Sequence, residues 1–144
     1  VLADGKPQDM NSLTGSAVFQ EDRLCESVSP IENVSMCAGR SIKTPRIKWE
    51  LARLLPEECL NRPVSTLSGG MKRRVAVIRA LLTPSRILLM DEPFTGMDDE
   101  LKRNVISYIR EKQDGRLLIL STHQEEDVEL IGGELVRLER CMDV

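Results

Sequence analysis

Short stretches of uninterrupted apolar residues divide the chain. Two of these stretches are Ile87–Met90 and Leu117–Leu120, and a shorter one covers Ala17–Phe19. An apolar run without polar alternation is typical of a strand that is buried on both faces of a parallel sheet. We therefore predict buried strands at these three places, and a further short strand near Leu135–Leu138.

Between these stretches the apolar residues recur at helical spacing. Ser68 precedes a segment whose apolar positions are Met71, Val75, Ile78 and Leu82. Serine is favoured at a helix start because its hydroxyl accepts a hydrogen bond from a free backbone N–H group. We predict a helix that is capped by Ser68 and ends at Thr83–Ser85.

The same argument predicts two further helices. In the first, Thr44 is the cap, Pro45 takes the first helical position, and Pro56 stops the helix. In the second, Asp98 is the cap, and acidic residues follow in the first turn, where the helix dipole favours negative charge. The predicted inward residues are Ile47, Leu51 and Leu54 in the first helix, and Leu101, Val105 and Tyr108 in the second.

Strands that alternate with helices indicate an α/β fold with a mainly parallel sheet. In such folds, binding and catalytic residues gather at the carboxyl ends of the strands. The polar residues of this sequence follow that rule, since Asp91, Glu92 and His123 come directly after predicted strands. We therefore expect one site at one edge of the sheet.

The composition narrows the possible function classes. With 144 residues, 41% hydrophobic and 30% charged, the chain has the size and balance of one folded domain. A net charge of −3 gives no electrostatic reason to expect a nucleic-acid partner, which requires a basic face. No apolar run approaches the roughly 20 residues of a membrane-spanning helix. The four cysteines form no C-x-x-C pair, so neither a zinc site nor a redox motif is indicated.

A pair of carboxylates follows the predicted strand at Ile87–Met90. Asp91 stands at its tip and Glu92 comes next. A phosphoryl-transfer site needs two such groups. One can hold Mg²⁺, directly or through water, and the other can orient or deprotonate the attacking water. A solvated strand end is the alternative interpretation, and the neighbouring motifs decide between the two.

The segment Leu67-Ser68-Gly69-Gly70-Met71 lies at a predicted helix start. Free backbone N–H groups and the positive end of the helix dipole attract an anion there, and two glycines let a phosphate approach closely. With this segment the chain resembles the ATP-binding domains of ABC transporters, whose signature sequence is usually Leu-Ser-Gly-Gly-Gln. Met71 departs from that pattern, in a way that resembles the nitrate, sulfonate and taurine importer ATPases.

Other landmarks of this family occur in the family's order. Gln20 resembles the Q-loop glutamine, Asp91 ends a segment that resembles the Walker B strand, and Glu92 resembles the catalytic carboxylate. The segment Thr95-Gly96-Met97-Asp98 resembles the D-loop, and His123, the only histidine, resembles the switch histidine that contacts the γ-phosphate. The resemblance covers about residues 1–138.

The resemblance implies site roles and ligands, and the implied ligands are ATP and Mg²⁺. Glu92, His123 and Gln20 are the implied catalytic residues. Asp91 and Gln20 are implied to hold Mg²⁺. The implied nucleotide-binding residues are Ser68, Gly69, Gly70 and Asp98.

The resemblance also implies an architecture. We expect an incomplete RecA-like P-loop NTPase core at residues 1–20 and 84–144, and a small α-helical subdomain with the signature motif at residues 21–83. Residues Glu21–Val34 resemble the groove that receives a coupling helix of a membrane subunit. The cations that follow the signature are predicted to form a solvated face: Lys72, Arg73, Arg74 and Arg79.

The implied partners are a second nucleotide-binding domain and transmembrane permease subunits. Two such domains associate head to tail and sandwich ATP between them. The implied location is cytoplasmic, on the inner face of the cell membrane. Nucleic acid is not an expected partner.

One family landmark does not occur in this sequence. The Walker A loop, G-x-x-x-x-G-K-[ST], holds the β- and γ-phosphates, and no such segment is present. The family places it upstream of the position that matches Val1. We therefore expect a partial domain, truncated before the Q-loop strand, that does not hydrolyse ATP alone. Its sheet would have a gap that leaves Leu117–Leu120 with an uncovered edge, and we expect self-association through that face.

Two other function classes stay open. One is a non-transport ABC protein of DNA repair or chromosome maintenance, whose helical insertion becomes a long coiled coil. The segment between Gln20 and Ser68 is short and has no sustained heptads, which argues against this class. The other is a non-enzymatic regulatory module with an ABC-like fold. A decayed site has no physical reason to retain all five expected residues, and the sequence retains Gln20, Ser68, Asp91, Glu92 and His123.

Overall fold

The computed structural model of the chain describes residues 2–3, 6–7 and 14–137. The strands are β1 (Leu2–Ala3), β2 (Lys6–Pro7), β3 (Gly15–Val18), β4 (Ile87–Asp91) and β5 (Leu117–Ser121). The helices are α1 (Pro30–Ser35), α2 (Thr44–Ala52), α3 (Gly69–Leu82), α4 (Asp99–Gln113) and α5 (Glu125–Ile131), with two short 3-10 helices, η2 (Glu57–Cys59) and η3 (Val64–Thr66).

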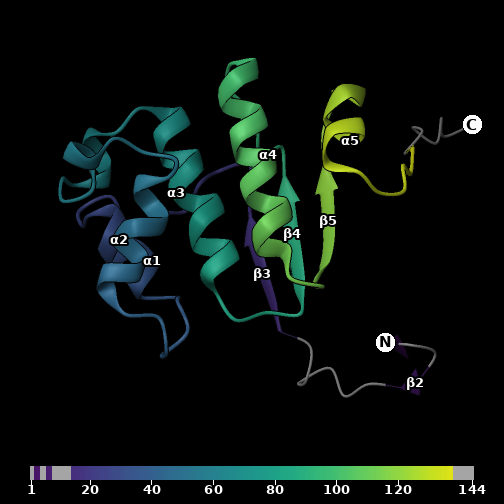
Figure 1. The fold of residues 1–144 in the computed structure, drawn as a ribbon, viewed down its shortest axis with the longest axis horizontal. Coiled ribbons are helices and arrows are strands. Elements are labelled where there is room, and N and C mark those ends of the chain that lie inside the picture. Colours follow the sequence, from purple (N-terminus) through teal and green to yellow (C-terminus); the bar gives the residue numbers. More distant parts are fainter. Residues whose placement is uncertain (1, 4–5, 8–13, 138–144) are drawn as a thin grey trace, which may run out of the picture.

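The main sheet has three parallel strands in the order β3-β4-β5. Val18 pairs with Met90, and Asp91 pairs with Ser121, so the three strands end at one edge. The short strands β1 and β2 form a separate antiparallel pair. Parallel strands joined through helices confirm the predicted α/β fold (Figure 1).

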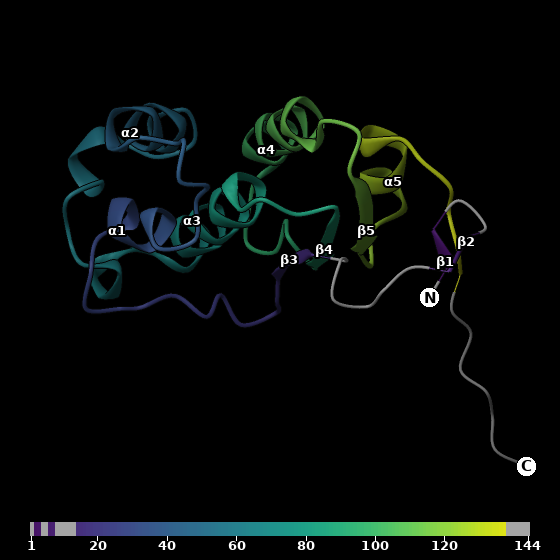
Figure 2. The same cartoon turned by 90° about the horizontal axis from the view of Figure 1, so that it is seen from below.

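The helices lie on one side of the main sheet. Figure 2 shows α3, α4 and α5 on that side, with α1 and α2 beyond α3. Leu88 and Met90 face these helices and are buried. The alternate side chains of Leu89, Leu117 and Ile119 are 44%, 57% and 52% exposed. The prediction that the strand at Ile87–Met90 is buried on both faces is therefore wrong, because no helix within residues 14–137 covers the second face. Leu117–Leu120 has the uncovered apolar side chains that were expected there.

The two strongest helix predictions are confirmed. The Ser68 hydroxyl accepts a hydrogen bond from the Met71 N–H group (3.3 Å) at the start of α3. The Asp98 carboxylate accepts one from the Leu101 N–H group (2.9 Å) at the start of α4. Each cap satisfies a donor that has no partner inside its helix. The predicted inward residues Val75, Ile78, Leu82, Val105 and Tyr108 are buried, whereas Met71 and Leu101 are half-buried.

Three boundaries differ from the predictions. Thr44 is the first residue of α2 rather than its cap, which is Lys43, and no side chain caps this helix. The helix ends at Ala52, short of Pro56, because Leu54 and Leu55 turn inward and are buried before the proline. Strand β3 ends at Val18, one residue before the predicted end at Phe19.

The predicted strand at 135–138 is wrong where it can be compared. Residues 135–137 have no regular secondary structure, and residue 138 lies outside the described residues. Leu135 and Val136 are exposed, and within the described residues no strand pairs with this segment. Within residues 14–137 and the two short strands, no helix is long and apolar enough to cross a bilayer.

Candidate functional site

Three of the predicted site residues follow the three parallel strands at one edge of the sheet. Gln20 comes two residues after β3, Glu92 one residue after β4, and His123 two residues after β5. The predicted signature and D-loop residues reach the same edge, because α3 and α4 both start there (Figure 1). The edge is therefore where the fold can assemble a site.

Asp91 and Glu92 are both tied to Ser121, the last residue of β5. The Ser121 hydroxyl donates a hydrogen bond to Asp91 Oδ1 (2.5 Å). The Glu92 N–H group donates to the Ser121 carbonyl oxygen (3.2 Å) and lies 3.3 Å from its hydroxyl oxygen. Glu92 has a φ angle of 47°, in the left-handed region that few residues with a β-carbon adopt. The contacts with Ser121 anchor the Glu92 backbone in that conformation.

Glu92 and His123 are brought together. His123 Nε2 lies 3.2 Å from Glu92 Oε1, although the two residues are on loops after different strands. The His123 side chain is 92% exposed, and the Glu92 side chain is 22% exposed. A half-buried carboxylate therefore lies within hydrogen-bond reach of an imidazole that is open to solvent, and groups at this distance can transfer a proton or orient a water molecule.

The predicted signature residues lie beside the loop that follows Glu92. A β-carbon placed on Gly70 would lie 3.4 Å from the Gly96 carbonyl oxygen, so the start of α3 and this loop are in close contact. Gly96 has a φ angle of 76°, which favours glycine. Ser68 and Gly69 are exposed at the helix start, and Gly69 has open space around its α-carbon. Asp98 is also exposed, and its carboxylate is occupied in capping α4.

Gln20 is held through its backbone. The Arg73 guanidinium donates hydrogen bonds to the carbonyl oxygens of Phe19 and Gln20, and it pairs with Asp22 (3.1 Å). Burial raises the pKa of Asp22 above its ordinary value, and the Arg73 charge opposes this shift. The Gln20 side chain is exposed, and within residues 14–137 no hydrogen bond joins its amide to Asp91, Glu92 or His123.

The predicted solvated face of α3 is wrong for the arginines. Arg73 is buried, and Arg79 donates to the carbonyl oxygens of Arg23 (2.8 Å) and Asp22 (3.1 Å). Arg74 donates to the carbonyl oxygens of Gly70 and Leu54. Guanidinium groups reach several backbone acceptors at once, so these side chains fasten loops to the helix instead of pointing into water. Only Lys72 behaves as predicted, in a surface ion pair with Glu26 (2.7 Å).

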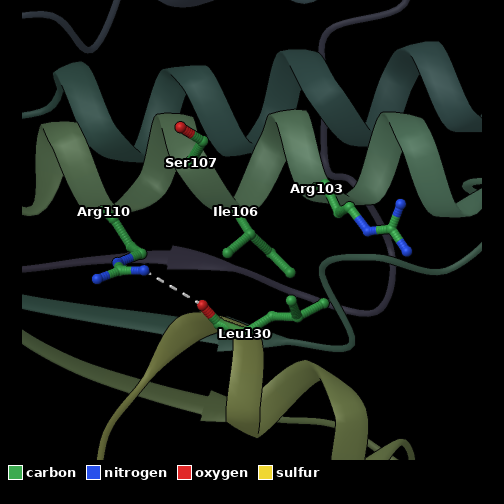
Figure 3. A pocket seen from close by; sticks show the side chains of 5 residues that line it. All are labelled: Arg103, Ile106, Ser107, Arg110 and Leu130. Atoms are coloured by element: carbon green, nitrogen blue, oxygen red, sulfur yellow. Dashed lines mark hydrogen bonds between the residues drawn. The ribbon is translucent and has the colours of Figure 1, made fainter.

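A pocket of about 240 Å³ contains part of the site. Its lining residues include Glu92, Gly96, Met97 and His123, together with Lys102, Gln124 and Asp127. A second hollow, of about 260 Å³, lies between α4 and α5 (Figure 3). It is lined by Arg103, Ile106, Ser107, Arg110 and Leu130, and it contains none of the predicted site residues.

Sequence reasoning missed Lys102 and Asp127, which are buried and paired (2.9 Å). One signal was available. Lys102 lies three residues before Val105 and four before Ile106, on the inward stripe of its helix, and a lysine on such a stripe needs a buried partner. Asp127 gave no comparable signal, because α5 is acidic along its first turn.

The residues present fit a magnesium ion only as a partial site. Within the described residues, no group of three acidic, histidine or cysteine side chains gathers as a metal cage. Asp91 offers one carboxylate, whose Oδ1 already accepts a hydrogen bond from Ser121. Magnesium usually takes one or two carboxylates and completes its shell with phosphate and water oxygens. The single exposed carboxylate of Asp91 at the strand tip is compatible with this coordination preference.

Comparison with known sequences identifies relatives. The sequence pattern of the ABC transporter family matches residues 5–95, more than half of the chain. A molybdenum import ATP-binding protein of Haemophilus ducreyi is 36% identical over 126 residues, which cover 85% of this chain and 35% of that protein. A thiamine import ATP-binding protein of Jannaschia sp. is 32% identical over 131 residues, 86% of this chain and 57% of that protein. ABC transporter A family member 8 of Dictyostelium discoideum is 31% identical over 128 residues, 85% of this chain and 15% of that protein.

Solved structures agree with these matches. A dimeric bacterial ABC transporter cassette superposes with a TM-score of 0.68 at 26% identity, over 82% of this chain and 56% of that chain. A dimeric cassette in a post-hydrolysis state, bound to ADP and Pi, gives a TM-score of 0.72 at 22% identity, over 89% and 64% of the two chains. The second likeness shows the fold alone. The chain spans between 15% and 57% of the length of the three curated relatives. By its sequence pattern and its fold, this chain belongs to the ABC transporter family and has the fold of that family's ATP-binding cassettes.

Proposed function

We propose that this chain is part of the subunit of an ABC importer that binds and hydrolyses ATP to drive solute transport. The observation that carries the proposal is the contact between Glu92 Oε1 and His123 Nε2 (3.2 Å) beside Asp91 at the carboxyl edge of the parallel sheet. The molybdenum and thiamine import relatives support import as the direction of transport.

Each residue at the edge has a separate task in this proposal. Glu92 accepts a proton from the attacking water or orients it, and its half-buried position keeps the carboxylate close to the reacting atoms. His123 holds Glu92 on one side and offers its exposed face to the γ-phosphate. Gln20 approaches from the loop after β3, where Arg73 holds its backbone. Asp91, with Gln20, would hold Mg²⁺, which neutralises developing phosphate charge when bound.

Ser68, Gly69, Gly70 and Asp98 act on the nucleotide of a second subunit. The exposure of the start of α3 supports this role. The helix start presents free N–H groups and two small residues to solvent beside the Gly96 loop. We propose a head-to-tail pair in which this edge closes over ATP that the partner holds. The two similar solved cassettes are both dimeric.

The setting of the proposed subunit is the cytoplasmic, inner face of a membrane, against permease subunits. Residues Glu21–Val34 would receive a coupling helix. The proposed division is a core at residues 1–20 and 84–144 and a helical subdomain at residues 21–83. Met71 in the signature favours a small oxyanion or a sulfonate as the solute.

The chain by itself should not hydrolyse ATP, because its sequence contains no Walker A loop to hold the β- and γ-phosphates. The test is a chimera in which a Walker A segment from an import relative precedes residue 1. We expect the chimera to hydrolyse ATP and the isolated chain to show no turnover. In the chimera, Glu92→Gln should lower kcat by about 100-fold or more while ATP still binds, since the change removes a base and no phosphate contact.

Glu100→Gln is the matched control, because Glu100 is an exposed carboxylate in the first turn of α4 and has no hydrogen bond or ion pair with Asp91, Glu92 or His123 among those of the described residues. This variant should keep the turnover of the parent chimera. Unchanged turnover in Glu92→Gln would mean that Glu92 is not the base. Micromolar ATP binding by the isolated chain, measured by titration calorimetry, would contradict the dependence on the Walker A loop.

A further inference from the structure

A buried ion pair joins α4 to α5 and contacts the loop that carries His123. Lys102 Nζ lies 2.9 Å from Asp127 Oδ1, and the two residues are 7% and 2% exposed. Lysine and aspartate are almost never buried to this extent unless they are paired. Such a pair loses much of its hydration free energy, so it adds little net stability compared with apolar residues of the same size. Its contacts therefore indicate what else it does.

The remaining contacts of the pair end on the two neighbours of His123. Asp127 Oδ2 accepts a hydrogen bond from the Thr122 hydroxyl (2.7 Å), and Lys102 Nζ donates to Gln124 Oε1. The Gln124 N–H group in turn donates to the Thr122 hydroxyl oxygen (3.1 Å). The residues before and after His123 are thus fastened to one buried pair. Among the hydrogen bonds and ion pairs of the described residues, none joins His123 to the pair, and its imidazole lies beside Glu92.

We propose that Lys102 and Asp127 are positioning residues, which act as a clamp on Thr122 and Gln124 and so hold the His123 imidazole against Glu92. A pair that only joined α4 to α5 would not need further contacts with the histidine loop. Here Asp127 Oδ2 binds Thr122 and Lys102 Nζ binds Gln124. The clamp also lines the pocket that contains Glu92 and His123. The consequence for ATP hydrolysis rests on the proposed function, whereas the positioning of His123 does not.

The experiment uses the fact that His123 is the only histidine of the chain. Its imidazole signals in a nitrogen-15 NMR spectrum therefore belong to one residue without further assignment. The spectrum is recorded at one fixed pH for the wild type, Glu92→Gln, Lys102→Met and the double variant. We expect Glu92→Gln to shift the imidazole signals in the wild-type background. In the Lys102→Met background, Glu92→Gln should shift the imidazole signals much less, because the imidazole no longer faces residue 92.

Two further variants separate positioning from general stability. Arg103→Met removes the neighbouring cation of α4, which is exposed and has no contact with Thr122 or Gln124 among those recorded for the described residues, so the full response to Glu92→Gln should remain. Lys102→Arg keeps a charged donor for Asp127 and should restore most of the response. If Lys102→Met does not fold, Thr122→Val replaces it. This variant removes the hydroxyl that donates to Asp127 without leaving a buried charge alone, and it should weaken the response.

Two outcomes would overturn the clamp. One is an undiminished response to Glu92→Gln in folded Lys102→Met or Thr122→Val. The other is no response in the wild type, since the contact between His123 and Glu92 would then not exist in solution. Neither measurement uses nucleotide. A chimera without ATPase activity would contradict the proposed function but not the clamp. An undiminished NMR response in the variants would contradict the clamp but not the proposed function.

Discussion

At the scale of single residues, charged side chains join the helical part of the chain to α4. Glu50 of α2 is buried, and its carboxylate accepts hydrogen bonds from the Tyr108 hydroxyl (3.0 Å) and from Lys112 Nζ (2.7 Å). Burial raises the pKa of Tyr108, and the Glu50 charge adds to this shift. Arg53 extends the network with a bidentate pair to Glu111 (2.9 and 2.6 Å). Each charged group at this junction therefore has defined partner atoms, although the Arg53–Glu111 pair is partly exposed.

The Glu111 carboxylate gives the junction a pH dependence. Hydrogen bonds from Arg53 and Lys112 lower the pKa of Glu111 from 4.5 to about 2. Because the pKa is lower in the folded state, the unfolded chain binds more protons between these values, and the contribution to stability present above about pH 4.5 is lost as the pH falls towards about 2. Glu111→Gln should flatten this part of the curve of urea midpoint against pH.

Arg53→Met should flatten the same part of the curve, since Arg53 is the main cause of the shift. Both effects will be small, because the carboxylate is solvent-exposed and water screens the pair. A variant curve that runs parallel to the wild type through the whole acid range would show that the pair does not form in solution.

At the scale of elements, α3 does more than bury an apolar face. Arg73 and Arg79 bind four backbone carbonyl oxygens of residues 19–23, the segment that leads out of β3. Ser16 of β3 also donates to the Ala80 carbonyl oxygen (2.8 Å). The helix that begins with the signature residues therefore fixes the segment that carries Gln20, and the two proposed site elements cannot move independently.

Removal of Arg73 should loosen that segment. We expect Arg73→Met to lower the free energy of unfolding by about 1–3 kcal/mol, because it leaves two part-buried carbonyl oxygens and the Asp22 carboxylate without their donor. Amide hydrogen exchange should accelerate most in residues 19–23. Lys72→Met is the matched control at the preceding position of the helix. Loss of the surface pair between Lys72 and Glu26 should change the free energy of unfolding by less than about 1 kcal/mol. Equal effects of the two variants in urea denaturation would contradict this account.

At the scale of the whole molecule, the main sheet is covered on one side only within residues 14–137. Leu89 and Ile119 are neighbours in the register, as are Ile87 and Leu117, so these four side chains share the uncovered face. Strand β5 is also the last strand in the sheet order, with a free edge among the described strands. Contiguous exposed apolar surface of this kind favours association.

We expect the isolated chain to self-associate through this face at micromolar concentration in sedimentation velocity. Ile119→Lys should shift the distribution towards the monomer, because a charge on this face cannot be buried without a partner. Met36→Lys is the control, since Met36 is an exposed apolar residue that follows α1, outside the sheet. A monomeric wild type, or an equal effect of both substitutions, would contradict association through the sheet.

The sequence by itself determined the elements whose causes are local. Ser68 and Asp98 cap their helices as predicted, and α3 and α4 follow the helical spacing of their apolar residues, because caps and periodicity act within a few residues along the chain. The order of motifs likewise placed Gln20, Glu92 and His123 after successive strands, since polar residues that follow parallel strands meet at one edge.

Only the tertiary structure decided which side chains are buried and which ones meet. The strand register brings Ser121 to Asp91, and the turns after β4 and β5 bring Glu92 to His123, across a sequence separation that no local pattern spans. The same holds for the pairing of Lys102 with Asp127, which sequence reasoning missed. It also holds for the hydrogen bond from Arg73 to the Gln20 carbonyl oxygen, because Arg73 was predicted to lie on a solvated face. Leu89 and Ile119 show the converse, because an apolar side chain is buried only where another element covers it, and here none within residues 14–137 does.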